Sequence, residues 1–157
     1  MLVLVDGLHS KKLFSHLSQL IPLEGTEILL AFVRSSSPRA GLELIRRRPG
    51  GHHLPPERAA ELSQAEVAAA ADALAEAGGF AHASGASVEM MQLTGEPGRA
   101  ICEVAATRHI DLVVVRAGGR DRPPLGPASL GPVARFVTDH CVAPVLLLRE
   151  LHGSPTH

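Results

Sequence analysis

A glycine pair that follows a short apolar run is the part of the sequence best suited to chemistry. The run is Leu112–Val115, and its mostly β-branched residues are typical of a strand buried on both faces. Gly118 and Gly119 follow, and Gly131-Pro132 then opens a periodic run that predicts a helix with proline in its first position. Free backbone N–H groups and the helix dipole favour an anion at such a turn, so the pattern predicts a phosphate site.

Other familiar motifs for catalysis and nucleotide binding are absent. A P-loop needs a lysine at its glycine turn, and the only lysines are Lys11 and Lys12. There is no G-x-G-x-x-G fingerprint, G-x-S-x-G elbow or C-x-x-C pair, and a receiver-type phosphoacceptor would need a lysine where Arg149 stands. We therefore expect a protein that is not an enzyme and has no catalytic residues. Slow ATP hydrolysis, with Asp6 as the general base, stays open.

The histidine pair His52-His53 invites a metal hypothesis. Adjacent histidines in an extended segment point to opposite sides, and no nearby Cys or acid completes a ligand set, so we expect no metal site. The pair belongs to residues 34–56, where Pro, Gly and Ser predict a long loop. This loop is either a flap that closes over an anion with its arginines or a mobile, solvated segment.

Composition and charge favour a single small α/β domain. The chain has 157 residues and a formal net charge of -1, which gives no reason to expect nucleic acid or an anionic membrane as a partner. No stretch approaches the roughly 18 uncharged residues that a membrane helix needs. Cys102 and Cys141 are expected to be buried free thiols, which fits a reducing, cytoplasmic location. We expect one domain over residues 1–150 and a disordered tail over 151–157.

The hydrophobic pattern predicts strands that alternate with helices. Strands are expected over residues 2–5, 26–33, 87–93, 112–115 and 145–148, and helices over 10–21, 57–77, 97–109 and 132–140. In the second helix, Leu62, Ala65, Ala69 and Ala73 are expected to lie against the sheet, and Gly78-Gly79 to end the helix. Alternation of this kind predicts right-handed βαβ units. The fold class is therefore α/β: a five-stranded, parallel, doubly wound sheet with helices on both faces.

Several of these segments together resemble the universal stress protein family over nearly the whole chain. They are LVLVDG at 2–7, TEILLAFV at 26–33, TGEPGRAICEVA at 94–105, DLVVV at 111–115 and HCVAPVLLLR at 140–149. The resemblance implies a Rossmann-like sheet and a homodimer paired through the last strand, Val145–Leu148. Bare apolar residues on that strand favour the same pairing, because an uncovered edge of this kind promotes aggregation. The resemblance also implies an ATP site, since many members bind ATP.

By this resemblance, an Asp at the end of strand one contacts the nucleoside, and a residue at the end of strand two lies near the adenine. The candidate site for ATP or another adenine nucleotide, with Mg, comprises Asp6, Phe32, Val33, Val115, Arg116, Gly118, Gly119, Gly131 and Val133.

The phosphate motif of the family, Gly-two residues-Gly-nine residues-Gly-Ser/Thr, is altered here. Arg116 replaces the first glycine, Pro132 replaces the Ser/Thr, and the gap after Gly119 is two residues too long. Pro132 has neither an N–H nor a hydroxyl to offer a phosphate, whereas Arg116 could bind one from the side. Two hypotheses follow. Either the protein is a regulatory, stress-response module whose ATP binding is lost or weakened and whose protein partner is unknown, or Arg116 and Gly118-Gly119 form a rebuilt phosphate site.

Overall fold

The computed structural model describes residues 1–7, 9–34, 56–118 and 130–149. Residues 35–55 of the predicted loop, among them His52-His53, lie outside the described residues, as do Gly119 and the predicted tail over 151–157. The described elements, in chain order, are β1 (Leu2–Val5), α1 (Ser10–Leu20), β2 (Glu27–Arg34), α3 (Pro56–Ala83), β3 (Ser87–Thr94), α4 (Pro97–Thr107), β4 (Val113–Ala117), α5 (Pro132–His140) and β5 (Val145–Arg149).

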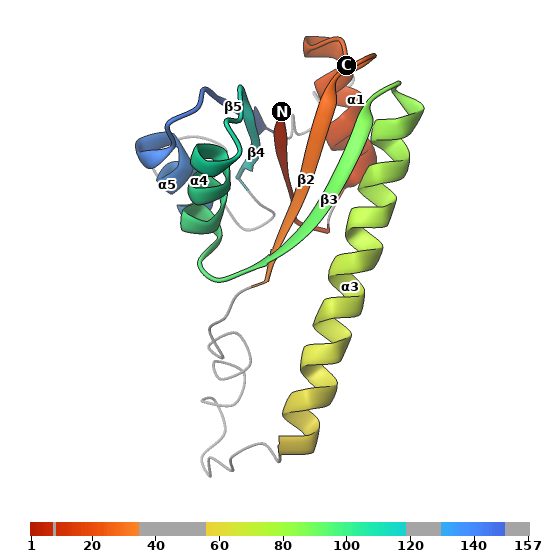
Figure 1. The fold of residues 1–157 in the computed structure, drawn as a ribbon, viewed down its shortest axis with the longest axis vertical. Helices are drawn as coiled ribbons and strands as arrows, with labels where there is room; N and C mark the ends of the chain where they lie inside the picture. Colours follow the sequence, from red (N-terminus) through yellow and green to blue (C-terminus); the bar gives the residue numbers. More distant parts are fainter. Residues whose placement is uncertain (8, 35–55, 119–129, 150–157) are drawn as a thin grey trace, which may run out of the picture.

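The five strands form one parallel sheet in the order β3-β2-β1-β4-β5 (Figure 1). The first strand is central: Leu2 pairs with Leu29 on one side and with Val113 on the other. The chain adds β2 and β3 on one side of β1, then crosses over and adds β4 and β5 on the other side. This arrangement confirms the predicted fold class, and it places the reversal of strand order between β1 and β4.

Helices cover both faces of the sheet because each strand alternates its apolar side chains between two cores (Figure 1). One core contains Val3, Leu30 and Val114 together with residues of α1 and α3. The other contains Leu2 and Val113 together with residues of α4 and α5. Within the described residues, Ser10 is the one polar side chain that is fully buried.

Helix α3 corrects two expectations. It continues through Gly78-Gly79 to Ala83, and Gly78 is buried next to the end of the Met90 side chain of β3. Its packed face consists of Ala70, Ala73, Leu74, Ala77 and Ala81, whereas Leu62, Ala65 and Ala69 are exposed. The helix has 28 residues, about 42 Å at 1.5 Å per residue, so its first half extends past the sheet (Figure 1). None of the described helices combines the length and apolar character of a membrane span.

Strand β4 extends two residues further than its apolar run. Arg116 and Ala117 continue the ladder because they pair with Leu148 and Arg149 of β5. Position 116, where the family motif has its first glycine, is therefore part of the sheet rather than of the loop that follows. Helix α4 ends at Thr107, two residues before the expected end.

Candidate functional site

The candidate site lies where the carboxyl ends of β1 and β4 meet. Asp6 follows the last residue of β1, and Arg116 is the penultimate residue of the neighbouring strand β4. Ligands of open α/β sheets bind at this kind of position, where the strand order reverses and the loops on the two sides diverge. The topology therefore brings together the two predicted site residues with opposite charges.

Arg116 and Asp6 form a two-point ion pair. The Nη1 atom of Arg116 donates to Oδ2 of Asp6 at 2.9 Å and to Oδ1 at 3.2 Å. The Arg116 side chain is 15% exposed and the Asp6 side chain 46% exposed, so the pair lies at the rim of the sheet. Both carboxylate oxygens thus accept hydrogen bonds from the residue that replaces the first glycine of the family motif. A ligand hydroxyl would have to compete with a charge-assisted bond to reach this carboxylate.

The glycine turn has a backbone geometry that requires glycine at two described positions. Gly118 has φ +90° and Gly131 has φ +79°, values that strain any residue with a side chain. The N–H of Gly118 donates to the carbonyl of Leu130 at 3.2 Å, so this donor is already used by a hydrogen bond within the protein. Helix α5 then begins at Pro132, which contributes no N–H, and Gly131 provides no side-chain cap. Gly119 lies outside the described residues.

The apolar residues of the candidate site divide between the two faces of the sheet. Val33, Val115 and Val133 belong to the core beneath α4 and α5. Phe32 belongs to the other core, and its ring lies 3.6 Å from where a Cβ on Gly7 would be. Of the two residues proposed to lie near an adenine, Val33 therefore shares a face with the glycine turn, and Phe32 does not.

The sequence pattern indicates Asp6 and Arg116 separately as site residues, but it does not indicate that they pair. The strand order would have revealed this pairing. Asp6 and Arg116 are 110 positions apart in the chain, but β1 and β4 are neighbours in the sheet. The sequence pattern also does not indicate how Glu96 caps α4: its carboxylate accepts the N–H of Gly98 at 3.1 Å and that of Arg99 at 2.8 Å. Pro97 signalled where the helix begins, but Glu is not among the preferred N-cap residues, so the sequence did not signal this role of its side chain.

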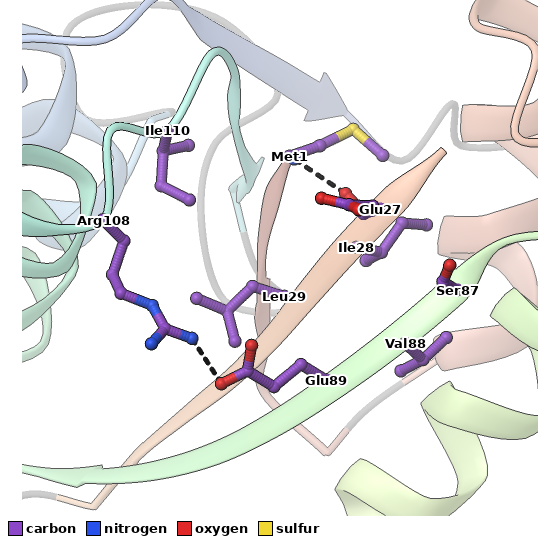
Figure 2. A pocket seen from close by; sticks show the side chains of 9 residues that line it. All are labelled: Met1, Glu27, Ile28, Leu29, Ser87, Val88, Glu89, Arg108 and Ile110. Atoms are coloured by element: carbon purple, nitrogen blue, oxygen red, sulfur yellow. Dashed lines mark hydrogen bonds and ion pairs between the residues drawn. The ribbon is translucent and has the colours of Figure 1, made fainter. Parts of the chain in front are cut away.

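A cavity of about 390 Å³ lies at the opposite end of the sheet from the candidate site (Figure 2). It lies where β2 and β3 begin and where the chain leaves α4. Arg108 lines the cavity and forms an ion pair with Glu89 of β3, and Leu29 and Ile110 also line it (Figure 2). The cavity contains none of the residues that the sequence analysis assigned to nucleotide binding.

Comparison with known proteins identifies the family. A sequence profile described as the Universal stress protein family matches residues 1–149. The chain belongs to the universal stress protein family. No curated protein matches this universal stress protein closely enough to serve as a relative.

Solved structures of other universal stress proteins share the fold. Universal stress protein UspA from Lactobacillus plantarum has a TM-score of 0.68 at 22% identity, over 95% of this chain and 97% of that one. A family protein from Arabidopsis thaliana with AMP bound has a TM-score of 0.62 at 20% identity, over 97% and 93% of the two chains. The protein from Archaeoglobus fulgidus in complex with dAMP has a TM-score of 0.53 at 19% identity, over 93% and 94%. At these identities the likeness shows the fold alone.

Proposed function

We propose that this protein is a non-enzymatic, homodimeric regulatory module of the universal stress protein family, in which ATP binding is lost or strongly weakened. It acts in the cytoplasm through a protein partner that its surface recognises. The observation that supports the proposal is the ion pair between Arg116 and Asp6. The residue that replaces a motif glycine holds the carboxylate to which the nucleoside would bind.

The cost to a nucleotide follows from the contacts of this pair. A nucleoside hydroxyl must compete with Arg116 for the half-exposed Asp6 carboxylate, at a cost of about 1 kcal/mol. The loss of the N–H at Pro132 and the hydrogen bond from Gly118 to Leu130 remove two donors from the phosphate side. A single loss of about 1.5–3 kcal/mol already corresponds to a decrease in affinity of roughly tenfold to a hundredfold. Two such losses lower the affinity by roughly a hundredfold or more.

A second candidate function is nucleotide binding through a rebuilt site. Gly118 and Gly131 retain the positive φ angles of a tight turn beside the start of α5, and the site lies at the reversal of strand order. Universal stress proteins with this fold have been solved with cAMP, with AMP and with dAMP. In this alternative, Arg116 leaves Asp6 and binds a phosphate together with the glycine turn, and Mg accompanies the nucleotide.

Thermal unfolding with and without millimolar Mg-ATP separates the two functions. We expect no change in Tm for the unaltered protein and a gain for the double variant Arg116→Gly/Pro132→Ser, which restores two motif positions. Ligand at about 100 times its Kd adds about 2.7 kcal/mol, or roughly 5–10 °C in Tm for a domain of this size. ADP and AMP serve as ligand controls.

Arg108→Ala is the matched control variant, because Arg108 also pairs with a carboxylate but lies at the far end of the sheet. If the unaltered protein shows the rise in Tm, and Arg116→Ala abolishes it while Arg108→Ala does not, the rebuilt site is correct and the loss of binding is refuted.

The proposed dimer rests on the edge strand β5. Val145, Leu146 and Leu147 are half-buried in one subunit, and Val142 beside them is 77% exposed. An apolar sheet edge that remains uncovered promotes aggregation, and pairing with a second β5 would cover it. We expect sedimentation to show a dimer and Leu147→Glu to yield monomers or insoluble protein. Leu20→Glu, on the exposed side of α1, is the matched control and should leave the dimer intact.

The absence of catalysis is also testable. The Asp6 carboxylate accepts two hydrogen bonds from a guanidinium, which makes it a poor general base for activating water. We therefore expect no steady phosphate release from ATP above the background. Release that disappears in Asp6→Asn would contradict the proposal.

A further inference from the structure

The two cysteines of the chain lie together at the contact between α4 and α5. Cys102 is in the middle of α4, and Cys141 is the residue that caps the carboxyl end of α5. Both are free thiols, both are half-buried, and both pack against the same apolar core. They are close enough that the Cys141 thiol, after burial, contributes to the raised pKa of Cys102. The sequence predicted two buried free thiols, whereas both are half-buried and lie at the same helix contact.

The packing of the two helices explains why the thiols meet. Gly98 of α4 faces Phe136 of α5 so closely that a Cβ on Gly98 would lie 2.9 Å from the Cβ of Phe136. The missing side chain thus lets the backbones of α4 and α5 approach at this point. Cys102 follows Gly98 by one helical turn, and Cys141 follows the buried Val137 by one turn, with its N–H bonded to the Val137 carbonyl at 2.9 Å. The thiols are therefore one turn further along the same helix contact.

We propose that Cys102 and Cys141 are a redox modification site, at which a hydroperoxide converts the two thiols into an intrachain disulfide. A disulfide requires two Cα atoms within about 4.4–6.8 Å, and the close approach of α4 and α5 at Gly98, one turn before the thiols, favours such a separation. The bond would tie α4 to α5 and close a loop of about 40 residues, which includes β4 and the glycine turn. Thiol reductants in a reducing compartment would reverse it.

The reaction balances with the hydroperoxide as the oxidant. The Cys141 thiolate attacks the outer oxygen of the peroxide, the O–O bond breaks, and the alcohol or water leaves with a proton, which gives a sulfenic acid at Cys141. The Cys102 sulfur then attacks the Cys141 sulfur; the S–O bond breaks, the S–S bond forms, and the Cys102 proton departs with the hydroxide as water. The sum is two thiols and one hydroperoxide giving one disulfide, one alcohol and one water.

The order of the two steps follows from the environment of Cys102. Burial, followed by the neighbouring Cys141 thiol, raises the pKa of the Cys102 thiol to about 11. Cys102 therefore keeps its proton at neutral pH and is a poor first nucleophile, because the thiolate is the reactive form. Cys102 therefore reacts second, and it gives up its proton as its sulfur attacks the sulfenic acid at Cys141.

The test is to treat the reduced full-length protein with hydrogen peroxide and to follow the intact mass and the Tm. We expect the mass to fall by about 2 Da, which is the loss of two hydrogens, and a peptide map without reductant to join the segments around Cys102 and Cys141. We also expect the Tm to rise by roughly 5–10 °C, because the cross-link restricts the unfolded chain, and to return to its first value with dithiothreitol.

Cys102→Ser and Cys141→Ser are the control variants, and each should fail to lose 2 Da and should show no rise in Tm. Cys102→Ala and Cys141→Ala repeat the controls without a hydroxyl in the core. The inference is overturned if the unaltered protein gains only oxygen, if it cross-links only between chains, or if its Tm falls when the intrachain disulfide forms.

Discussion

The substitution Gly98→Ala is a direct test of how α4 packs on α5. Gly98 is the second residue of α4 and is buried against the ring of Phe136. An alanine Cβ would lie 2.7 Å from Cδ1 of that ring and 2.9 Å from both its Cγ and its Cβ. Carbon atoms in contact are normally about 3.5–4.0 Å apart, so the helices would have to separate by roughly 1 Å.

Two opposing terms set the size of the effect. Overpacking of this kind costs about 1–3 kcal/mol, and the Phe136 Cβ cannot move away without its helix. Alanine recovers up to about 1 kcal/mol over glycine through its helix propensity. The packing term is larger, so we expect a net loss of about 1–2 kcal/mol in the free energy of unfolding. The Tm should fall by roughly 2–8 °C.

Urea denaturation measures this loss as a lower midpoint at an unchanged m-value. The matched control is Gly79→Ala in α3, because no atom lies within 4 Å of a Cβ at that position. This variant should be more stable than the unaltered protein by about 0.5–1 kcal/mol. If Gly98→Ala also stabilises the protein, or if Gly79→Ala destabilises it, the packing described for these helices is wrong.

Three further predictions follow from other contacts. A double-mutant cycle with Asp6→Asn and Arg116→Met should give a coupling energy of about 1 kcal/mol in urea denaturation. High salt should reduce this coupling because Asp6 is half-exposed. A coupling of zero would mean that the pair does not persist in solution. Glu96→Ala should cost about 1–2 kcal/mol because two N–H groups of α4 lose their acceptor, and an unchanged urea midpoint would show that the cap contributes nothing. The pKa of Cys102 is raised from 9.0 to about 11, so the unfolded chain ionises first and stability should fall as the pH rises from 9 through 11. Cys102→Ser should flatten this fall in pH-dependent denaturation, and an equal fall in the variant would place its cause elsewhere.

The fold was predictable because its signals are local and repeated. Apolar runs such as Val113–Val115 and prolines at the first helical positions, Pro97 and Pro132, each define one element without reference to the others. The packing face of α3 was not predictable in this way. Alanines occur all around that helix, so only contact with the sheet distinguishes Ala70 and Ala77 from the alanines that remain exposed.

The candidate site was predictable as a set of positions but not as a set of contacts. The sequence placed Asp6 and Arg116 at strand ends, and it identified the loss of a glycine and of a hydroxyl from the phosphate motif. It could not show that the two charges neutralise each other, because this depends on β1 and β4 being neighbours. The contact of Cys102 with Cys141 was hidden for the same reason: it depends on how two helices cross.

The projecting half of α3 has a consequence for the dynamics of the molecule. Residues 57–69 are exposed along the whole length of this half, where the one hydrogen bond from another described element is donated by Gln92 to the carbonyl of Val67 at 3.4 Å. A helix without packing is only marginally stable in water, so this half depends on its Ala-rich composition and on the continuous hydrogen bonds from the packed half. Its amide hydrogens should therefore exchange with solvent through fraying from the amino end, while those from Ala70 onward exchange only when the sheet opens. The projecting half of α3 should therefore unfold locally while the half from Ala70 onward remains folded on the sheet.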